Sequence, residues 1–217
     1  MFQVTQVGSW PRSEDLLRAL TDLQQGRMTR EDFDRVADGE VRRAVDLQHE
    51  AGVDIVVDGE QRRDSFVSFV TEKLDGTRLM SMAETADDVE SFKEELAAAD
   101  VAPDSILNPV CTGKLSRREP LAVDEYKFVR ELTDRPVKVP LPGPYILIRS
   151  MWSPKFSREF YQDPTEMADD IVGILRDELI ELRDAGADFV QFDEPVLTEV
   201  VFSGDDEEGE SFSRTFM

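Results

Sequence analysis

Two stretches of the sequence follow one plan: EAGVDIVVDGE at residues 50–60 and DAGADFVQFDE at residues 184–194. Each begins with an acid, Ala and Gly, continues with an aspartate two residues on, and then has an apolar run that ends on glutamate. A short apolar run bounded by turn residues is typical of a buried strand, and a glycine ahead of it is typical of a helix end. The repeat predicts a helix, a glycine turn and a strand with an acidic end, occurring twice. This is the unit from which parallel α/β sheets are built.

A segment with helical periodicity precedes each copy. The first begins at Thr29, with Asp32 placed for a capping-box-like arrangement, and the second runs from about Pro164. Gly52 and Gly186 are expected to end these two helices. Apolar residues recur at helical spacing in both segments: Phe33, Val36, Val41, Ala44, Val45 and Leu47 in the first, and Met167, Ile171, Ile174, Leu175, Leu179 and Leu182 in the second.

Two further strands fit this scheme. Residues 2–10, FQVTQVGSW, alternate between apolar and polar side chains, and residues 137–144, VKVPLPGP, follow a helical stretch at 124–134. The prolines of 137–144 are unwelcome in a central strand, because proline cannot donate a ladder hydrogen bond. The predicted order is strand, helix, strand, a long connection, strand, helix, strand. Right-handed crossovers would make the four strands parallel neighbours.

The remaining segments are interpreted as additions to this sheet within a single domain, residues 1–217. Residues 62–123 form an elaborated connection that we expect to pack over one end of the sheet. It includes an acidic, alanine-rich helix at 83–100 and a stretch at 108–116. Residues 203–217 read as a polar tail.

The composition excludes several classes of function. The chain has 217 residues, with 47 acids against 25 bases and a net charge of −22, which should repel nucleic acid and anionic membranes. A carboxylate-rich folded protein of this kind is typical of a salt-saturated cytoplasm, where salt screens the repulsion. One cysteine rules out an internal disulfide and argues against a zinc site within one copy. We find neither a membrane span nor a secretory signal, so a cytoplasmic location is expected.

Four predicted strand ends carry residues suited to a binding site. They are Gly-Ser-Trp-Pro at 8–11, Asp-Gly-Glu at 58–60, Pro-Gly-Pro at 142–144 and Asp-Glu-Pro at 193–195. In parallel α/β domains, sites form where the carboxyl ends of the strands meet the following loops. A hydroxyl and several carboxylates that converge on one rim suit a ligand with an ammonium group.

Each of these residues also has a purely structural interpretation. Residues 8–11 could be a tight turn, Glu60 a surface acid, and Asp193 with Glu194 a cap for the next segment. Trp152 is as compatible with the core as with a ligand platform. No phosphate-binding glycine loop of Rossmann or Walker spacing is present.

Other reactive side chains favour structural roles. Arg62, Arg63 and Asp64 are expected to form a solvated ion-pair cluster. His49 reads as a helix-surface or packing residue. Cys111 is expected to be a small buried residue, since no histidine lies near it in the sequence.

Four stretches together resemble the cobalamin-independent methionine synthase family in its short archaeal-type form. They are VGSWPR at 7–12, VDGEQRRDSF at 57–66, PLPGP at 140–144 with a tryptophan beyond it, and QFDEPVL at 191–197, and they occur in the family's order. The resemblance implies a (β/α)₈ TIM-type barrel. It also implies a methyltransferase of methionine biosynthesis, in which zinc activates homocysteine as a thiolate and a methylfolate or corrinoid-borne donor supplies the methyl group.

Site residues follow from the resemblance position by position. Val7, Gly8 and Ser9 would hold the homocysteine backbone. Glu60 and Asp193 would bind its amino-acid end, with Glu194 supporting the rim, and Trp152 would lie beside the methyl donor.

The family's zinc ligands, a His-x-Cys pair, a glutamate and a second cysteine, come after the Asp-Glu-Pro strand, as does its proton-donating histidine. Here no His and no Cys follows residue 195, so no catalytic residue and no metal ligand is assigned. The expectation is an incomplete barrel with about the first four βα units, inactive alone and completed by a second polypeptide or by self-association. Two alternatives stay open. One is a glycosidase that uses Glu60 and Glu194 with carboxyl groups roughly 5 to 9.5 Å apart. The other is a non-catalytic amino-acid-binding remnant.

Overall fold

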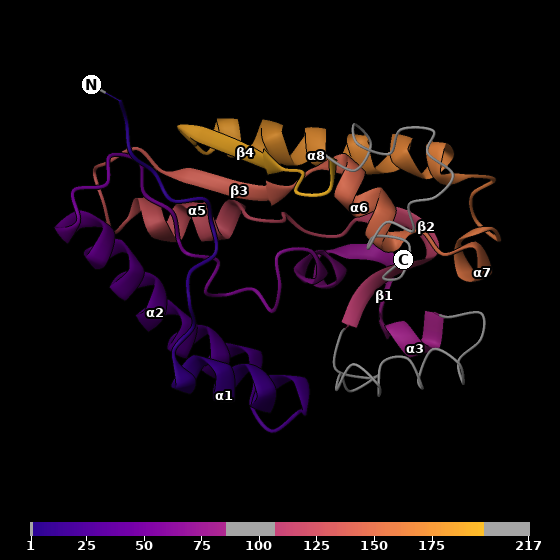
Figure 1. Cartoon of the computed structure of the whole chain (residues 1–217), viewed down its shortest axis with the longest axis horizontal. Helices are drawn as coiled ribbons and strands as arrows, with labels where there is room; N and C mark the ends of the chain where they lie inside the picture. The colour runs from indigo at the N-terminus through magenta and orange to yellow at the C-terminus, as the bar shows by residue number, and fades with distance from the viewer. Residues whose placement is uncertain (1, 86–106, 198–217) are drawn as a thin grey trace, which may run out of the picture.

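The structure is a computed structural model that describes residues 2–85 and 107–197 (Figure 1). Nearly all of the predicted acidic helix at 83–100 and the whole polar tail at 203–217 lie outside these residues.

A parallel arrangement of four segments lies at the centre of the fold. β3 (Lys138–Pro142) and β4 (Phe189–Asp193) are parallel, with Lys138 opposite Phe189 and Pro142 opposite Asp193. Single parallel bridges, Thr5 to Ile55 and Val56 to Val137, add the N-terminal segment and the first copy of the repeat. The four predicted strand segments are therefore parallel neighbours in sequence order, although the first two form bridges rather than full strands.

The prolines of β3 are tolerated because the neighbouring segment around Val56 ends before it would pair with them. The Lys138 N–H donates to the Val56 carbonyl at 2.8 Å. Alternate residues of a strand face the same neighbour, so Pro140 and Pro142 occupy the next positions on that edge. The neighbouring segment turns away at Asp58, which leaves no ladder hydrogen bond for these prolines to lose.

Helices connect the parallel segments; the first and last begin and end close to their predicted limits, whereas the second, predicted at 124–134, ends at Arg130. They are α2 (Arg30–Glu50), α5 (Val123–Arg130) and α8 (Pro164–Asp184). Thr29 caps α2 through the Asp32 N–H, as predicted. Gly52 (φ +74°) and Gly186 (φ +92°) follow the ends of α2 and α8 in the left-handed region that glycine tolerates.

Several elements were not predicted. α1 (Glu14–Gln24) packs on α2, while α6 (Pro144–Met151) and α7 (Pro154–Ser157) follow β3. Inside the predicted 62–123 connection lie η1 (Ser68–Glu72), β1 (Leu74–Ser81), α3 (Met82–Thr85) and β2 (Leu107–Arg117). β1 and β2 form an antiparallel pair that packs against α6, α7 and α8.

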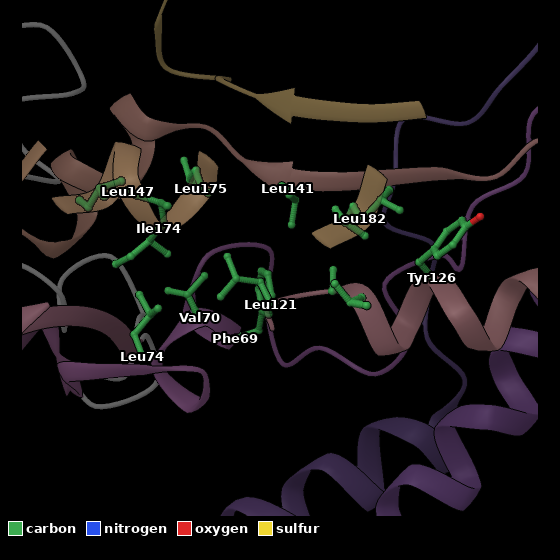
Figure 2. Packing of buried hydrophobic residues seen from close by; sticks show 14 of the residues in the cluster. Phe69, Val70, Leu74, Leu121, Tyr126, Leu141, Leu147, Ile174, Leu175 and Leu182 are labelled. Atoms are coloured by element: carbon green, nitrogen blue, oxygen red, sulfur yellow. The ribbon is translucent and has the colours of Figure 1, made fainter. Parts of the chain in front are cut away.

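One main hydrophobic cluster joins these layers. Figure 2 shows side chains from β3, α5, α8 and the segment around η1 facing one another, among them Leu141, Leu182, Phe69 and Tyr126. α1 and α2 share a second, smaller cluster. The two outermost parallel segments expose large apolar side chains: Phe2, Val4 and Val7 on one, and Phe189, Phe192 and Leu197 at the other. Within residues 2–85 and 107–197, no helix is both long and apolar enough to cross a membrane.

Candidate functional site

Residues from separate strand ends meet around Gly8. A Cβ atom added to Gly8 would overlap the Glu60 Oε1 atom and would lie 3.3 Å from the Pro140 side chain. Asp193 lies near enough to Glu60 for its charge to raise the Glu60 pKa. The structure thus brings together Gly8, Glu60 and Asp193, which the sequence places on three different strand ends.

Glu60 sits in a left-handed turn. Gly59 has φ +72° and Glu60 has φ +55°, and Glu60 is the one non-glycine residue with positive φ in the described part of the chain. An L-residue in this region is uncommon and persists where its surroundings hold it. The Glu60 N–H donates to Asp58 Oδ1 at 2.9 Å, and the Glu60 carbonyl accepts from Arg12 Nη2 at 3.1 Å.

The Glu60 carboxyl group is buried without a full set of partners. Glu60 is 2% exposed, and its Oε2 atom has no hydrogen-bond partner among the described residues. Burial raises the Glu60 pKa to about 7; Arg63 opposes this rise, while Asp58, Glu125 and Asp193 add to it. A buried carboxyl group that titrates near neutrality has the capacity to bind a cation or to exchange a proton.

A side-chain relay orients Asp193. Lys138, which is buried, donates from Nζ to Gln191 Oε1 at 2.7 Å and to the Gln6 carbonyl. Gln191 Nε2 donates to Asp193 Oδ1 at 2.6 Å and to the Val7 carbonyl at 3.0 Å. Burial lowers the Lys138 pKa, and the charge of Asp193 opposes that shift. The relay ties the first, third and fourth parallel segments together beneath the site.

Glu194 has a different role from its neighbour. Its two carboxylate oxygens accept the N–H groups of Tyr145 at 2.7 Å and Ile146 at 2.9 Å, at the start of α6. A Cβ atom on Gly143 would overlap the same carboxylate. Glu194 therefore caps a helix, as in the structural interpretation of this pair, but the helix is α6, about fifty residues earlier, and not the segment that follows. Because both oxygens are engaged, this geometry argues against the glycosidase alternative with Glu60 and Glu194.

The other predicted site residues are less closely engaged. The Val7 side chain is exposed, although its carbonyl accepts from Gln191. Ser9 is exposed on the same segment. Trp152 lies at the end of α6, half-buried and packed against the main hydrophobic cluster. Its predicted place beside a methyl donor stays a prediction.

The expected solvated cluster at residues 62–64 is wrong for Arg63. Its side chain is 1% exposed, pairs with Glu125 at 2.6 Å and donates to the Pro140 carbonyl at 2.9 Å. Arg62 pairs with Asp38. Arg63 contacts residues that are 62 and 77 positions away in the sequence, so no local sequence pattern could indicate that its side chain is buried.

His49 and Cys111 have structural positions, as predicted. His49 Nε2 hydrogen-bonds the Thr133 hydroxyl at 2.7 Å on the flank of α2. Cys111 is fully buried in the main cluster, its Sγ donates to the Gly113 carbonyl, and burial raises its pKa. Within the described residues, no group of three or more His, Cys, Asp or Glu side chains is placed to hold a metal ion. These residues do not fit the zinc ion that the resemblance implies.

Arg12, Lys138 and Gln191 were not identified from the sequence. Gln191 lies two residues before Asp193, so the two-residue period of a strand would have placed both on one face. Lys138 is a charge between two valines of an apolar strand, which is also a usable signal. For Arg12 the only signal is its place directly after the first strand end.

Comparisons with known proteins show the family to which the chain is related. The model of the family described as "Cobalamin-independent synthase, Catalytic domain" matches residues 2–216. A 5-methyltetrahydropteroyltriglutamate–homocysteine methyltransferase of Parvibaculum lavamentivorans is 32% identical over 195 residues, which are 90% of this chain and 23% of that protein. Its namesake in Saccharomyces cerevisiae is 29% identical over 92% of this chain and 24% of the relative. The chain thus spans about a quarter of the length of these relatives.

Two solved structures share the fold of this chain. A B12-independent methionine synthase from Shewanella, in complex with selenomethionine, has a TM-score of 0.64 and 25% identity. It is matched over 88% of this chain and 51% of its own. A putative vitamin-B12-independent methionine synthase from Listeria monocytogenes, at 20% identity and a TM-score of 0.65, shares the fold over 99% of this chain and 58% of its own.

Proposed function

Because the chain belongs to the cobalamin-independent methionine synthase family, we propose that its strand ends bind the amino-acid end of homocysteine. The reaction served is methyl transfer from a methylfolate-type donor to the homocysteine thiolate. Thiolate is the nucleophilic form of a thiol, and attack on the methyl group forms the new S–C bond as the donor's bond to that methyl breaks.

The observation that supports this proposal is a pair of neighbouring carboxylates, Glu60 and Asp193, of which Glu60 lies against Gly8. Glu60 has a buried oxygen without a partner, and Asp193 is held by Gln191 at 2.6 Å. An ammonium group would supply the hydrogens that Glu60 lacks and would offset the repulsion between the two carboxylates. The bare backbone of Gly8 leaves room for close approach of a ligand backbone.

Residues 7–9 are assigned to the homocysteine backbone on the same basis. Their segment is held in place by the hydrogen bond between Val7 and Gln191 and by the contact of Gly8 with Glu60. Trp152 is assigned to the methyl donor through the family resemblance.

The site needs more than the described residues supply. The matched solved structures are about 1.7 times as long as this chain, which covers 51% and 58% of them. We therefore assign to this chain about the first four βα units of an eight-unit barrel, with 62–123 as an elaborated connection. The rest of the barrel would come from a second polypeptide or from self-association. The described residues hold no ligand set for zinc, so no step is assigned to zinc here.

A comparison of two ligands tests the binding step. Methionine and 4-(methylthio)butanoate differ by the amino group, and calorimetry should show binding of methionine at least 10-fold tighter. Asp193→Asn should remove most of this difference, whereas Asp169→Asn, on the exposed surface of α8, should not. Equal affinity for the two ligands would contradict recognition of the ammonium group.

Turnover distinguishes an enzyme from a binding remnant. Mixing the chain with a polypeptide that supplies the family's His-x-Cys half should produce methionine from homocysteine and methylfolate. Methionine binding without turnover in that mixture would favour the non-catalytic alternative.

A further inference from the structure

Residues 10–12, at the end of the N-terminal parallel segment, are hydrogen-bonded to the turn that carries Glu60. The Trp10 N–H donates to the Gly59 carbonyl at 3.0 Å. Gln61 Nε2 donates back to the Trp10 carbonyl at 3.2 Å and to the Gly59 carbonyl at 2.8 Å. These hydrogen bonds join two strand ends that lie about fifty residues apart in the sequence.

The Arg12 side chain also donates hydrogen bonds to this turn. Its Nη2 donates to the Glu60 carbonyl at 3.1 Å and to the Arg63 carbonyl at 2.8 Å. The Arg63 N–H donates to the same Glu60 carbonyl at 3.2 Å. The Glu60 carbonyl thus accepts from two donors. The Arg12 guanidinium group binds the carbonyls of both Glu60 and Arg63, which lie at the two ends of the turn.

We propose that Arg12 is a positioning residue, whose guanidinium holds the Gly59–Glu60 turn in the left-handed conformation that keeps the Glu60 carboxylate against Gly8. The proposal deepens the proposed function, because Glu60 is the group assigned to the ligand's ammonium. It concerns the conformation of the protein without ligand, so it can be tested whether or not methionine binds.

The geometry favours arginine over lysine at this position. One planar nitrogen with two hydrogens can serve two carbonyls at fixed angles, whereas the lysine ammonium is a compact point charge on a flexible stem. Arg12 is half-buried, so its replacement leaves the main core intact.

Charges near Glu60 come from several elements. Arg63 favours its ionised form, while Asp58, Glu125 and Asp193 oppose ionisation. Arg12 contacts the backbone of Glu60 rather than its carboxylate. Loss of Arg12 should therefore act by loosening the turn and admitting water to the carboxyl group.

A carbon-13 titration of the Glu60 carboxyl group measures this effect. In the unaltered chain its midpoint is expected at about 7. In Arg12→Met the midpoint should fall by at least one pH unit toward the ordinary value, and amide exchange at residues 59–63 should accelerate at least 10-fold. Arg12→Lys should restore part of both properties. Arg18→Met, which removes an exposed arginine of α1, should change neither.

The outcomes separate the two proposals. An unchanged midpoint and unchanged exchange in folded Arg12→Met would overturn the positioning role, even if methionine binds the unaltered chain. Should Arg12→Met fail to fold, the same measurements apply to Arg12→Gln, whose shorter side chain does not reach both carbonyls, and an unchanged midpoint with unchanged exchange there would overturn it equally. A shifted midpoint in a chain that does not bind methionine would sustain the positioning role and reject the proposed function.

Discussion

Gly8 has no Cβ atom, and the Glu60 carboxylate occupies the space that a Cβ would fill. The lack of a side chain at this position is what lets the site form. In Gly8→Ala the new Cβ would overlap Glu60 Oε1 and crowd Pro140. We predict at least a 10-fold loss of methionine affinity in calorimetry, with a destabilisation of about 1–3 kcal/mol from overpacking.

A matched glycine provides the control. Gly173 lies inside α8 with nothing within 4 Å of an added Cβ. Gly173→Ala should raise the free energy of unfolding by about 0.5–1 kcal/mol and leave affinity unchanged, because alanine favours the helix. Equal losses of affinity in both variants would contradict the account of Gly8.

Glu60 should make stability depend on pH. Its folded pKa, about 7, lies above its ordinary value of 4.5. Its stabilising effect is therefore fully present below about pH 4.5 and is lost as the pH rises toward 7, by up to about 3 kcal/mol. Glu60→Gln should thus be close to neutral at pH 5 and stabilising at pH 8, as measured by urea denaturation. A difference between variant and parent that stays constant with pH would mean that Glu60 titrates normally.

At the residue scale, the site residues Gly8, Glu60 and Asp193 could be predicted from the sequence. The side chains that hold them in position could not. Glu60 and Asp193 are visible because an acid at the end of an apolar strand is locally unusual. Arg12 and Lys138 are not, because their contacts span 48 to 132 residues. Such contacts depend on the fold as a whole rather than on the residues nearby.

Glu194 is predicted to stabilise an element rather than to bind a ligand. It accepts two N–H groups at the start of α6, where the helix dipole also favours a negative charge. Glu194→Ala should lower the free energy of unfolding by about 1–2 kcal/mol in urea denaturation, as loss of a helix cap does. Methionine affinity should stay within about twofold of the parent. A large loss of affinity with unchanged stability would instead place Glu194 in the binding site.

At the element scale, the parallel strands and long helices could be predicted, whereas the antiparallel β1 and β2 could not. The repeat, the caps and the glycines specify α2 and α8 locally. β1 shows no regular alternation of buried and exposed residues and is interrupted by a bulge at Gly76. Gly76 has φ +78° and lies against the Lys114 backbone, so the pairing depends on a partner more than thirty residues away.

For the whole molecule, net charge should govern stability in salt. A charge of −22 on 217 residues opposes compaction. Raising KCl from 0.1 to 2 M shortens the screening length to less than about 3 Å and should raise Tm by at least about 5 °C at pH 8. Near the isoelectric point of about 4.3 the same addition should have much less effect. Equal responses at both pH values would indicate a general salt effect rather than relief of charge repulsion.

The family and the α/β architecture could be predicted because four short motifs in a fixed order define where parallel strands end. What lies against the two outermost parallel segments could not, since the residues around their exposed apolar side chains do not specify a partner.

The titration of the Glu60 carboxyl group, followed by carbon-13 spectroscopy with and without ligand, tests most directly whether these strand ends recognise an amino acid. Saturating methionine should lower the midpoint from about 7 by at least one pH unit, because an ammonium beside the carboxylate favours ionisation. The analogue 4-(methylthio)butanoate should leave it in place. A midpoint that methionine does not move would contradict the assignment of Glu60 to the ammonium of the substrate.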